Sequence, residues 1–113
     1  MRFPRSARIT LRADFDRVFA MGRRHRTRYF TLLSVAADER ARLGLVIGRR
    51  VARHAVVRNR LRRMVREVFR HASLPALDVV VLARPDLNVV DIDTLRGDLE
   101  QGFCKLSRKC DKS

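Results

Sequence analysis

The sequence predicts an α+β fold in which helices pack against a mixed β-sheet. Apolar residues recur at helical spacing in three segments, and residues that favour strands fill three others. The 113 residues suit one small domain, and 46% of them are apolar, which is enough to fill a core. We therefore expect a single domain over residues 1–113, with helices covering the sheet.

The first half of the chain predicts a helix followed by two strands. A helix over 11–21 has one apolar face, follows Thr10 as a good N-cap, and ends before Gly22. Residues 29–35 and 43–48 are rich in strand formers and are separated by a polar turn. We expect these two strands to pair as a hairpin.

The second half predicts a helix, a strand and a helix. Segment 54–71 places its aliphatic residues within about 100° of one another on a helix, and arginines occupy most of the remaining circumference. The continuous apolar run at 78–83 indicates a strand buried on both faces. Asp91 is a suitable N-cap for a last helix over 92–108. Periodicity alone does not reveal whether 49–53 forms a further short strand.

The charge indicates a polyanionic partner. The chain carries 26 Lys and Arg against 12 Asp and Glu, a net charge of +14. The first 70 residues hold 20 of these basic residues and only five acids, and the run 23–28 contains no acid. Nucleic acid is the leading polyanion, and an acidic membrane surface or an acidic protein is the alternative.

The sequence contains neither a membrane-spanning segment nor a recognisable catalytic constellation. No apolar run is long enough to span a bilayer, and the first residues lack the apolar stretch of a secretion signal, so we expect a cytoplasmic protein. Each histidine lies in a basic stretch away from a candidate nucleophile or zinc-type partner. Cys104 and Cys110 have no second pair and are interpreted as free thiols. We expect no catalytic residue and no metal site in this chain.

The helix over 54–71 is the most informative element. A solvated helix face normally mixes charges of both signs, whereas Glu67 is the only acid among the arginines here. Asn59 is a middling helix former, but its amide both donates and accepts hydrogen bonds, which suits phosphate or hydroxyl groups. The segment Arg58–Glu67 resembles the Arg-Asn-Arg signature of the protein subunit of bacterial ribonuclease P.

The resemblance extends over most of the chain. Segments 14–22, 43–50 and 78–85 resemble the family's first helix, the strand before its signature helix and its last strand. They occur in the family's order over residues 8–106. The resemblance implies an α-β-β-β-α-β-α fold with a left-handed crossover around the signature helix, where general rules favour a right-handed one.

The same resemblance implies a function in tRNA processing. A large RNA subunit is the catalyst and removes the 5′ leader of precursor tRNA with Mg²⁺, which is bound mainly through RNA. The protein, one copy per RNA subunit, assists by binding the catalytic RNA and the leader. A basic structural RNA-binding protein, such as a ribosomal protein, would present the same basic face and is the alternative. A free-standing nuclease lacks support from any His or carboxylate cluster.

The resemblance also implies two sets of site residues. The residues that would face the catalytic RNA are Arg58, Asn59, Arg60, Arg62, Arg63 and Arg66, preceded by Arg49, Arg50 and Arg53. The residues that would line a leader-binding cleft between the first helix and the sheet are Phe15, Phe19, Phe30, Thr31 and Leu33. The spacing of Phe15 and Phe19 fits stacking on unpaired bases and packing in a core equally well. Leu33 departs from the aromatic residue of some family members.

Overall fold

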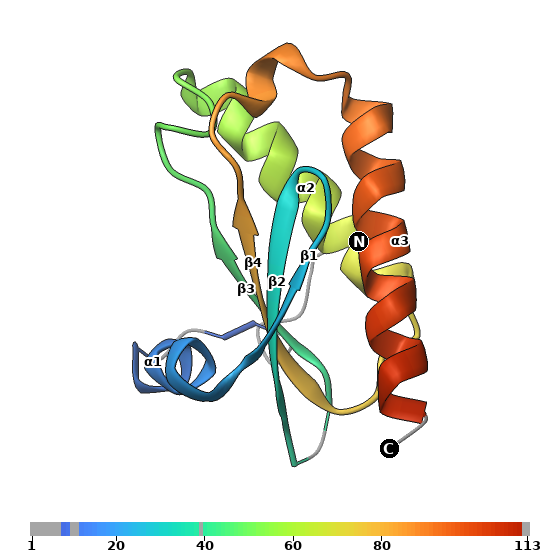
Figure 1. Ribbon diagram of the computed structural model, residues 1–113. Helices are drawn as coiled ribbons and strands as arrows, with labels where there is room; N and C mark the ends of the chain where they lie inside the picture. Colours follow the sequence, from blue (N-terminus) through green and yellow to red (C-terminus); the bar gives the residue numbers. More distant parts are fainter. Residues whose placement is uncertain (1–7, 10–11, 39, 112–113) are drawn as a thin grey trace.

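A computed structural model describes residues 8–9, 12–38 and 40–111. It confirms the predicted order α-β-β-β-α-β-α (Figure 1). The elements are α1 (Arg12–Met21), β1 (Arg23–Arg26), β2 (Phe30–Ala36), β3 (Arg42–Val46), α2 (Ala55–His71), β4 (Leu77–Ala83), the short 3₁₀ helix η2 (Leu87–Val89) and α3 (Ile92–Asp111).

The four strands form one mixed sheet in the order β1-β2-β4-β3. β4 is antiparallel to β2 and parallel to β3, and α2 connects β3 to β4. The left-handed sense of this connection stays a prediction. The expected hairpin between β2 and β3 is wrong because β4 lies between them. β4 contains three completely buried residues, Val79, Val80 and Val81. A strand that is apolar on both faces is favoured at the centre of a sheet, because there it has neighbouring strands at both edges and packed layers on both faces.

The additional strand precedes the predicted ones. Residues 49–53 form no strand, whereas β1, formed by Arg23–Arg26, pairs with β2 at the sheet edge. Its sequence of three arginines and one histidine shows no alternation of apolar and polar residues. An edge strand needs only one neighbour for its backbone hydrogen bonds, so β1 forms without an apolar side.

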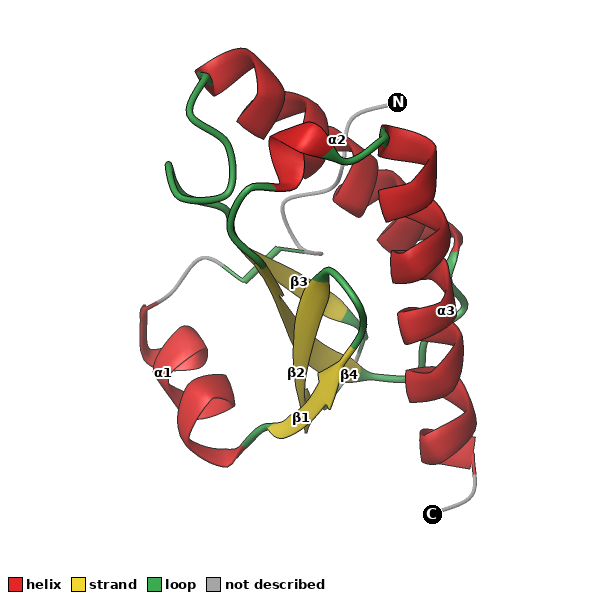
Figure 2. Cartoon of the chain, turned by 45° about the horizontal axis from the view of Figure 1, so that its top comes forward, coloured by secondary structure: helices red, strands yellow, loops and turns green. Residues whose placement is uncertain are grey.

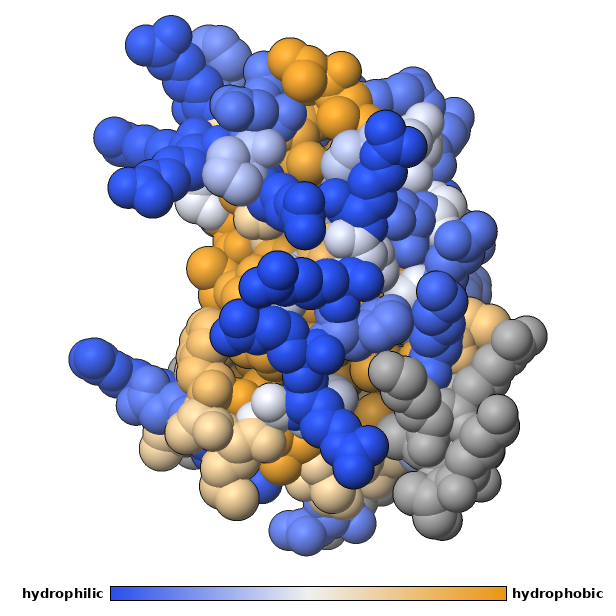
Figure 3. All heavy atoms as spheres, viewed as in Figure 1, coloured by the Kyte–Doolittle hydropathy of each residue, from blue (hydrophilic) through white to orange (hydrophobic). Residues whose placement is uncertain are grey.

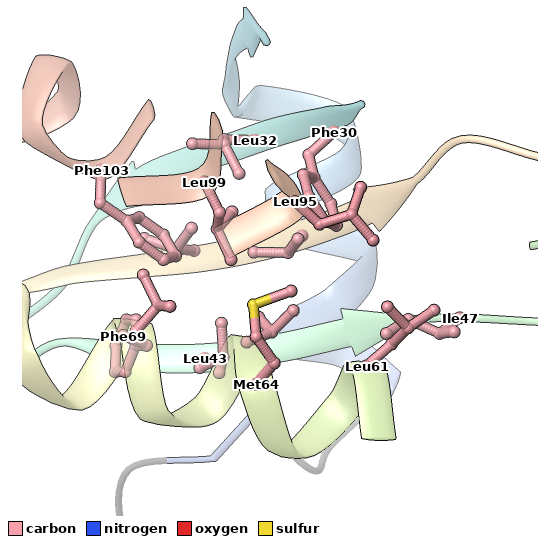
Figure 4. Packing of buried hydrophobic residues seen from close by; sticks show 14 of the residues in the cluster. Phe30, Leu32, Leu43, Ile47, Leu61, Met64, Phe69, Leu95, Leu99 and Phe103 are labelled. Atoms are coloured by element: carbon pink, nitrogen blue, oxygen red, sulfur yellow. The ribbon is translucent and has the colours of Figure 1, made fainter. Parts of the chain in front are cut away.

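The sheet separates α1 from α2 and α3 (Figure 2), and apolar layers of unequal size lie on its two faces. α2 and α3 cover one face and enclose the main core, in which side chains of the two helices point toward one another and toward the sheet (Figure 4). The rings of Phe69 and Phe103 meet edge to face with centroids 5.8 Å apart. This layer buries Phe30 and Leu32 of β2 completely.

α1 covers part of the opposite face. Val18 of α1 packs on Leu33 and Val80, while Phe15 is only half-buried beside them. Asp78 of β4, also on this face, is completely buried. Its carboxylate accepts hydrogen bonds from Arg17 of α1 and from Arg42 of β3, the latter at 2.7 Å through both Nε and Nη2. These ion pairs connect α1 and β3 to the centre of the sheet.

Two helix ends agree with their sequence signals. α1 ends before Gly22, whose N–H donates to the carbonyl of Val18 at 2.7 Å; a Cβ at Gly22 would collide with that carbonyl. The Oδ2 of Asp91 accepts from the backbone N–H groups of Asp93 and Thr94 at 3.1 and 3.3 Å, which confirms the expected N-cap of α3. The predicted cap Thr10 lies outside the described residues.

Candidate nucleic-acid interface

The apolar side of α2 determines which of its residues face outward. Leu61, Met64 and Val65 are buried against the sheet and α3. Helical periodicity therefore turns the arginines away from the core. Arg60 and Arg63 are exposed to solvent. Of the residues predicted from the sequence, Asn59, Arg62, Arg63 and Arg66 line one groove on this outward side, and Arg58 and Arg60 do not line it. Glu67 is the only acid among the described residues that line this groove.

Two of these arginines are tied to backbone carbonyls. Arg58 donates through Nη1 to the carbonyl oxygens of Ala52 and Arg53 at 3.0 and 2.9 Å. Arg62 donates through Nη2 to the carbonyl oxygen of Ile47 at 3.0 Å and through Nη1 to the Oδ1 of Asn59 at 3.0 Å. Both side chains therefore hold the segment between β3 and α2 in place.

The side-chain Oδ1 of Asn59 accepts the hydrogen bond from Arg62 and so helps to orient its guanidinium. The side chain is exposed, and the amide NH₂ remains able to donate to a phosphate or hydroxyl group. This arrangement explains an asparagine in the interior of a helix. It orients a neighbouring guanidinium and adds a neutral donor to a cationic surface.

The loop before α2 is anchored by buried residues and by the loop after β4. Val51 and Ala52 are buried. The N–H groups of Asp86 and Leu87 donate to the carbonyls of Arg50 and Val51, each at 2.9 Å. The loop therefore presents its charged side chains from a well-supported backbone. The exposed residues are Arg49, Arg50 and Arg53.

A groove of about 490 Å³ runs along the basic face of α2. Burial and the nearby charges of Arg8 and Arg62 lower the pKa of Arg66 from its ordinary value. Like charges are thus held close together, and a bound polyanion would relieve their repulsion. The groove is lined by Arg8, Asn59, Arg62, Arg63, Arg66, Glu67 and Arg70.

Arg8 is a member of this groove that sequence reasoning missed. Its backbone forms a parallel bridge with Leu43 of β3, and the N–H of Ile9 donates to the carbonyl of Leu43 at 2.9 Å. Pairing along the edge of β3 brings Arg8 to α2, which begins 47 positions later in the chain. The only sign of this role in the sequence is that Arg8 belongs to the basic segment at the amino terminus.

A smaller pocket of about 180 Å³ joins this groove to α1. It shares Arg8, Arg62 and Arg66 with the groove, and it adds Phe15 of α1 and apolar residues of β3. The Phe15 ring lies directly on the backbone of Gly44, because a Cβ at that glycine would come within 2.7 Å of it. Phe15 therefore packs on the sheet and also borders the basic surface.

Phe19, one turn of α1 further on, is 46% exposed, and Val46 of β3 is 42% exposed. Phe15 thus combines packing with partial exposure, and about half of the Phe19 side chain is exposed. Thr31 is half-buried on the same face of the sheet as Leu33. In Figure 3 a recess with apolar lining opens at the left, between the α1 end of the molecule and the opposite end.

Two residues predicted to line this cleft are buried instead. Phe30 is completely buried in the core between the sheet, α2 and α3, so its assignment to the cleft is wrong (Figure 4). The reason is the alternation of side chains along β2, which directs Phe30 and Thr31 to opposite faces. Leu33 faces the cleft side but is only 1% exposed, so it packs beneath α1 and supports the cleft floor.

The part of the chain that the structure describes contains no group of three or more His, Cys, Asp or Glu side chains able to hold a metal ion. Cys104 is a free, exposed cysteine of α3. None of the described helices is long and apolar enough to cross a membrane.

Comparisons with known proteins show the family to which this chain is similar. A family model described as Ribonuclease P matches residues 3–107. The ribonuclease P protein component of Thioalkalivibrio sulfidiphilus is 41% identical over 111 residues, covering 96% of this chain and 92% of that protein. The corresponding protein of Marinobacter nauticus is 38% identical over 111 residues, covering 95% and 83%.

Solved structures show the same fold. The Staphylococcus aureus RNase P protein matches with a TM-score of 0.80 and 28% identity, over 88% of this chain and 94% of that one. The RNase P protein from Thermotoga maritima matches with a TM-score of 0.73 and 35% identity, over 89% and 96%.

Proposed function

Because this chain belongs to the family of ribonuclease P protein components, we propose that its two surfaces bind two RNAs, the ribonuclease P RNA and the 5′ leader of precursor tRNA. A protein of this family is the non-catalytic subunit of a ribonucleoprotein endoribonuclease that processes tRNA, and its partner is the ribonuclease P RNA. Family membership favours this function over that of a ribosomal protein.

One observation carries the proposal. The arginine-lined groove of α2 continues through shared residues into the pocket beside Phe15. Neutralising phosphates with arginine releases counterions and supplies affinity without sequence preference. Half-exposed aromatic and apolar side chains next to such a groove suit unpaired bases, which stack on aromatic rings. A phosphate-binding surface and a base-binding surface therefore adjoin.

We assign the ribonuclease P RNA to α2 and to the loop before it. Arg60 and Arg63 are exposed, and Arg58 and Arg62 stabilise the backbone from which the loop arginines project. We assign the leader to the cleft of α1 and the sheet, with Phe15, Phe19 and Thr31 as contact residues. Since mature tRNA has no leader, holding the leader favours precursor over product.

Mg²⁺ is the cofactor of the whole ribonucleoprotein in this proposal and is bound mainly through RNA. The basic surface assists by neutralising phosphates, which lets RNA strands approach and raises local Mg²⁺ occupancy. In this proposal one protein binds each RNA subunit, as the resemblance to the family implies. We place this complex in the cytoplasm.

The first experiment measures precursor cleavage by the ribonuclease P RNA at low Mg²⁺, with and without the protein. We expect the protein to raise the cleavage rate and to increase the preference for precursor over mature tRNA. An unchanged rate and an unchanged preference would contradict the proposal.

The second experiment measures binding to the ribonuclease P RNA as a function of salt. Arg63→Gln should weaken binding and reduce the slope of log K against log salt by about 0.9 when one phosphate contact of a duplex is lost. Lys105→Gln, which removes one exposed positive charge from α3, is the matched control and should leave the slope nearly unchanged. Equal effects of both variants would contradict the assignment to α2.

A further inference from the structure

β1 carries a concentration of charge that the function proposed above does not use. Arg23, Arg24 and Arg26 are exposed, and the run 23–28 contains no acid. The strand lies at the edge of the sheet opposite β3, so it is separated from the α2 groove by the width of the sheet. In Figure 3, viewed as in Figure 1, hydrophilic side chains lie over β1.

The register of β1 with β2 separates these side chains between the two faces of the sheet. Arg24 is opposite Leu33 and Arg26 is opposite Thr31. Residues directly opposite each other in an antiparallel pair project on the same face. Leu33 packs beneath α1, so Arg24 and Arg26 belong to the face that holds the cleft.

The other two residues of β1 belong to the opposite face. Arg23 is opposite Ser34, and His25 is opposite Leu32, which is buried in the core with α2 and α3. His25 also lines a pocket of about 250 Å³ with Gln101 and Lys105 of α3. Arg26 borders the same pocket at the end of β1, so Arg24 is the arginine that faces only the cleft side.

From this arrangement we infer that Arg24, assisted by Arg26, binds phosphates of the leader where the strand passes from the cleft onto β1. The inference rests on the proposed function, because it extends the leader site by one strand. The spacing of neighbouring strands is about 4.8 Å. This is less than the length of an extended nucleotide, so a leader lying over Thr31 reaches β1 with the next nucleotide or two.

The charges on this face favour an RNA strand as the occupant. Asp78 accepts from Arg17 and Arg42, and Asp14 also pairs with Arg42 at 3.4 Å. Among the described residues, no acidic side chain forms an ion pair with Arg24. A guanidinium donates two parallel hydrogen bonds to a phosphate, which makes arginine well suited to a flexible, single-stranded backbone.

The test uses the complex of this protein with ribonuclease P RNA and compares Arg24→Gln with Arg23→Gln. Both variants remove one exposed charge from β1, but on opposite faces. The substrates are a precursor tRNA with a long leader and one with a leader of a single nucleotide. Arg24→Gln should weaken binding of the long-leader precursor about threefold to fivefold, and it should lower the salt slope by about 0.7.

Arg24→Gln should bind the precursor tRNA with the single-nucleotide leader as tightly as the unmodified protein does. Arg23→Gln should bind both precursors like the unmodified protein. Arg26→Gln should change binding in the same direction as Arg24→Gln. Thermal unfolding of each variant checks that the sheet edge remains folded.

Phe19→Ala separates failure of this inference from failure of the proposed function. If Phe19→Ala lowers the preference for the long leader while Arg24→Gln does not, the inference is overturned and the leader cleft stands. If neither variant lowers that preference, the cleft assignment fails as well. Equal losses for Arg24→Gln and Arg23→Gln, or equal losses for both leader lengths, would also overturn the inference.

Discussion

The two faces of the sheet are built from alternate residues of the same strands, yet they are covered to very different extents. On one face, two long helices enclose a continuous apolar layer that includes Phe30 and Phe103, both fully buried. On the other, the single short helix α1 buries Val18, Leu33 and Val80 and leaves Phe19 exposed. The first face supplies most of the apolar burial that stabilises the fold.

The second face relies on charge as well as on apolar contact. Asp78, completely buried, binds Arg17 and Arg42, and its hydrogen bond holds the pKa of Arg42 above the ordinary value. Ion pairs of this kind hold α1 on the sheet while leaving neighbouring apolar groups accessible. Apolar burial is therefore concentrated on one face, and the other face keeps aromatic and charged side chains accessible.

The largest effect is expected from truncation in the closed face. Phe103→Ala removes a fully buried ring that packs on Phe69, and a change of this kind costs about 3–5 kcal/mol of unfolding free energy. Denaturant unfolding measures it. Val56→Ala on α2, where the side chain is 73% exposed, is the control and should cost less than about 0.5 kcal/mol. Similar losses for both variants would contradict the assignment of stability to this layer.

The next effect concerns the ion pairs of the open face. Asp78→Asn should cost about 2–4 kcal/mol, less than for a fully buried pair because Arg17 and Arg42 are partly exposed and therefore screened. Asp14→Asn breaks only the longer contact with Arg42 and should cost less than about 1 kcal/mol. Urea unfolding compares the two variants. If they are equally stable, Asp78 does not hold α1 in place.

A smaller effect is expected where α1 meets β3. Gly44→Ala places a Cβ against the ring of Phe15, so the ring must move, at a cost of about 1–3 kcal/mol. The same change should reduce the preference for precursor over mature tRNA. Gly48→Ala is the matched control, since a Cβ at Gly48 meets no atom within 4 Å. A reduced preference in Gly48→Ala, or an unchanged one in Gly44→Ala, would contradict the role of Phe15.

The smallest effect on stability is expected at Phe19. Because the ring is half exposed, Phe19→Ala should cost less than about 1 kcal/mol in thermal unfolding. Its effect on binding should be larger, since stacking of one base on an aromatic ring is worth about 1–3 kcal/mol. Leader-dependent binding with the ribonuclease P RNA measures that loss. A large loss of stability with no loss of binding would show that Phe19 stabilises the fold and does not bind the leader, which would contradict the difference proposed between the two faces.

The helices and the arginine face of α2 were predictable from the sequence because both are local properties. Periodicity at 3.6 residues per turn assigns Leu61 and Met64 to the core and Arg60 and Arg63 to solvent without knowledge of the rest of the fold. The same reasoning identified Asp91 as a cap, since an N-cap bonds to backbone groups two and three residues later.

The pairing and facing of the strands were decided only by the tertiary structure. β1 has no apolar pattern, and β4 lies between β2 and β3 although it follows both in sequence. The run from Tyr29 to Val35 places apolar residues on both faces of a strand, so it shows no alternation that would reveal that Phe30 faces the core and Thr31 the cleft. Which face each residue takes depends on the helices that cover the sheet, and these come from distant parts of the chain.

The sequence by itself therefore determined the order of the elements other than β1, the excess of positive charge and the outward face of α2. Tertiary structure decided that Arg8 joins the groove, that Arg58 and Arg62 hold backbone carbonyls, and that Arg24 shares a face with Thr31. The physical reason is the distance along the chain between the residues that interact. A helix face follows from residues within a few turns, whereas a sheet face and a groove follow from contacts between segments far apart in the chain.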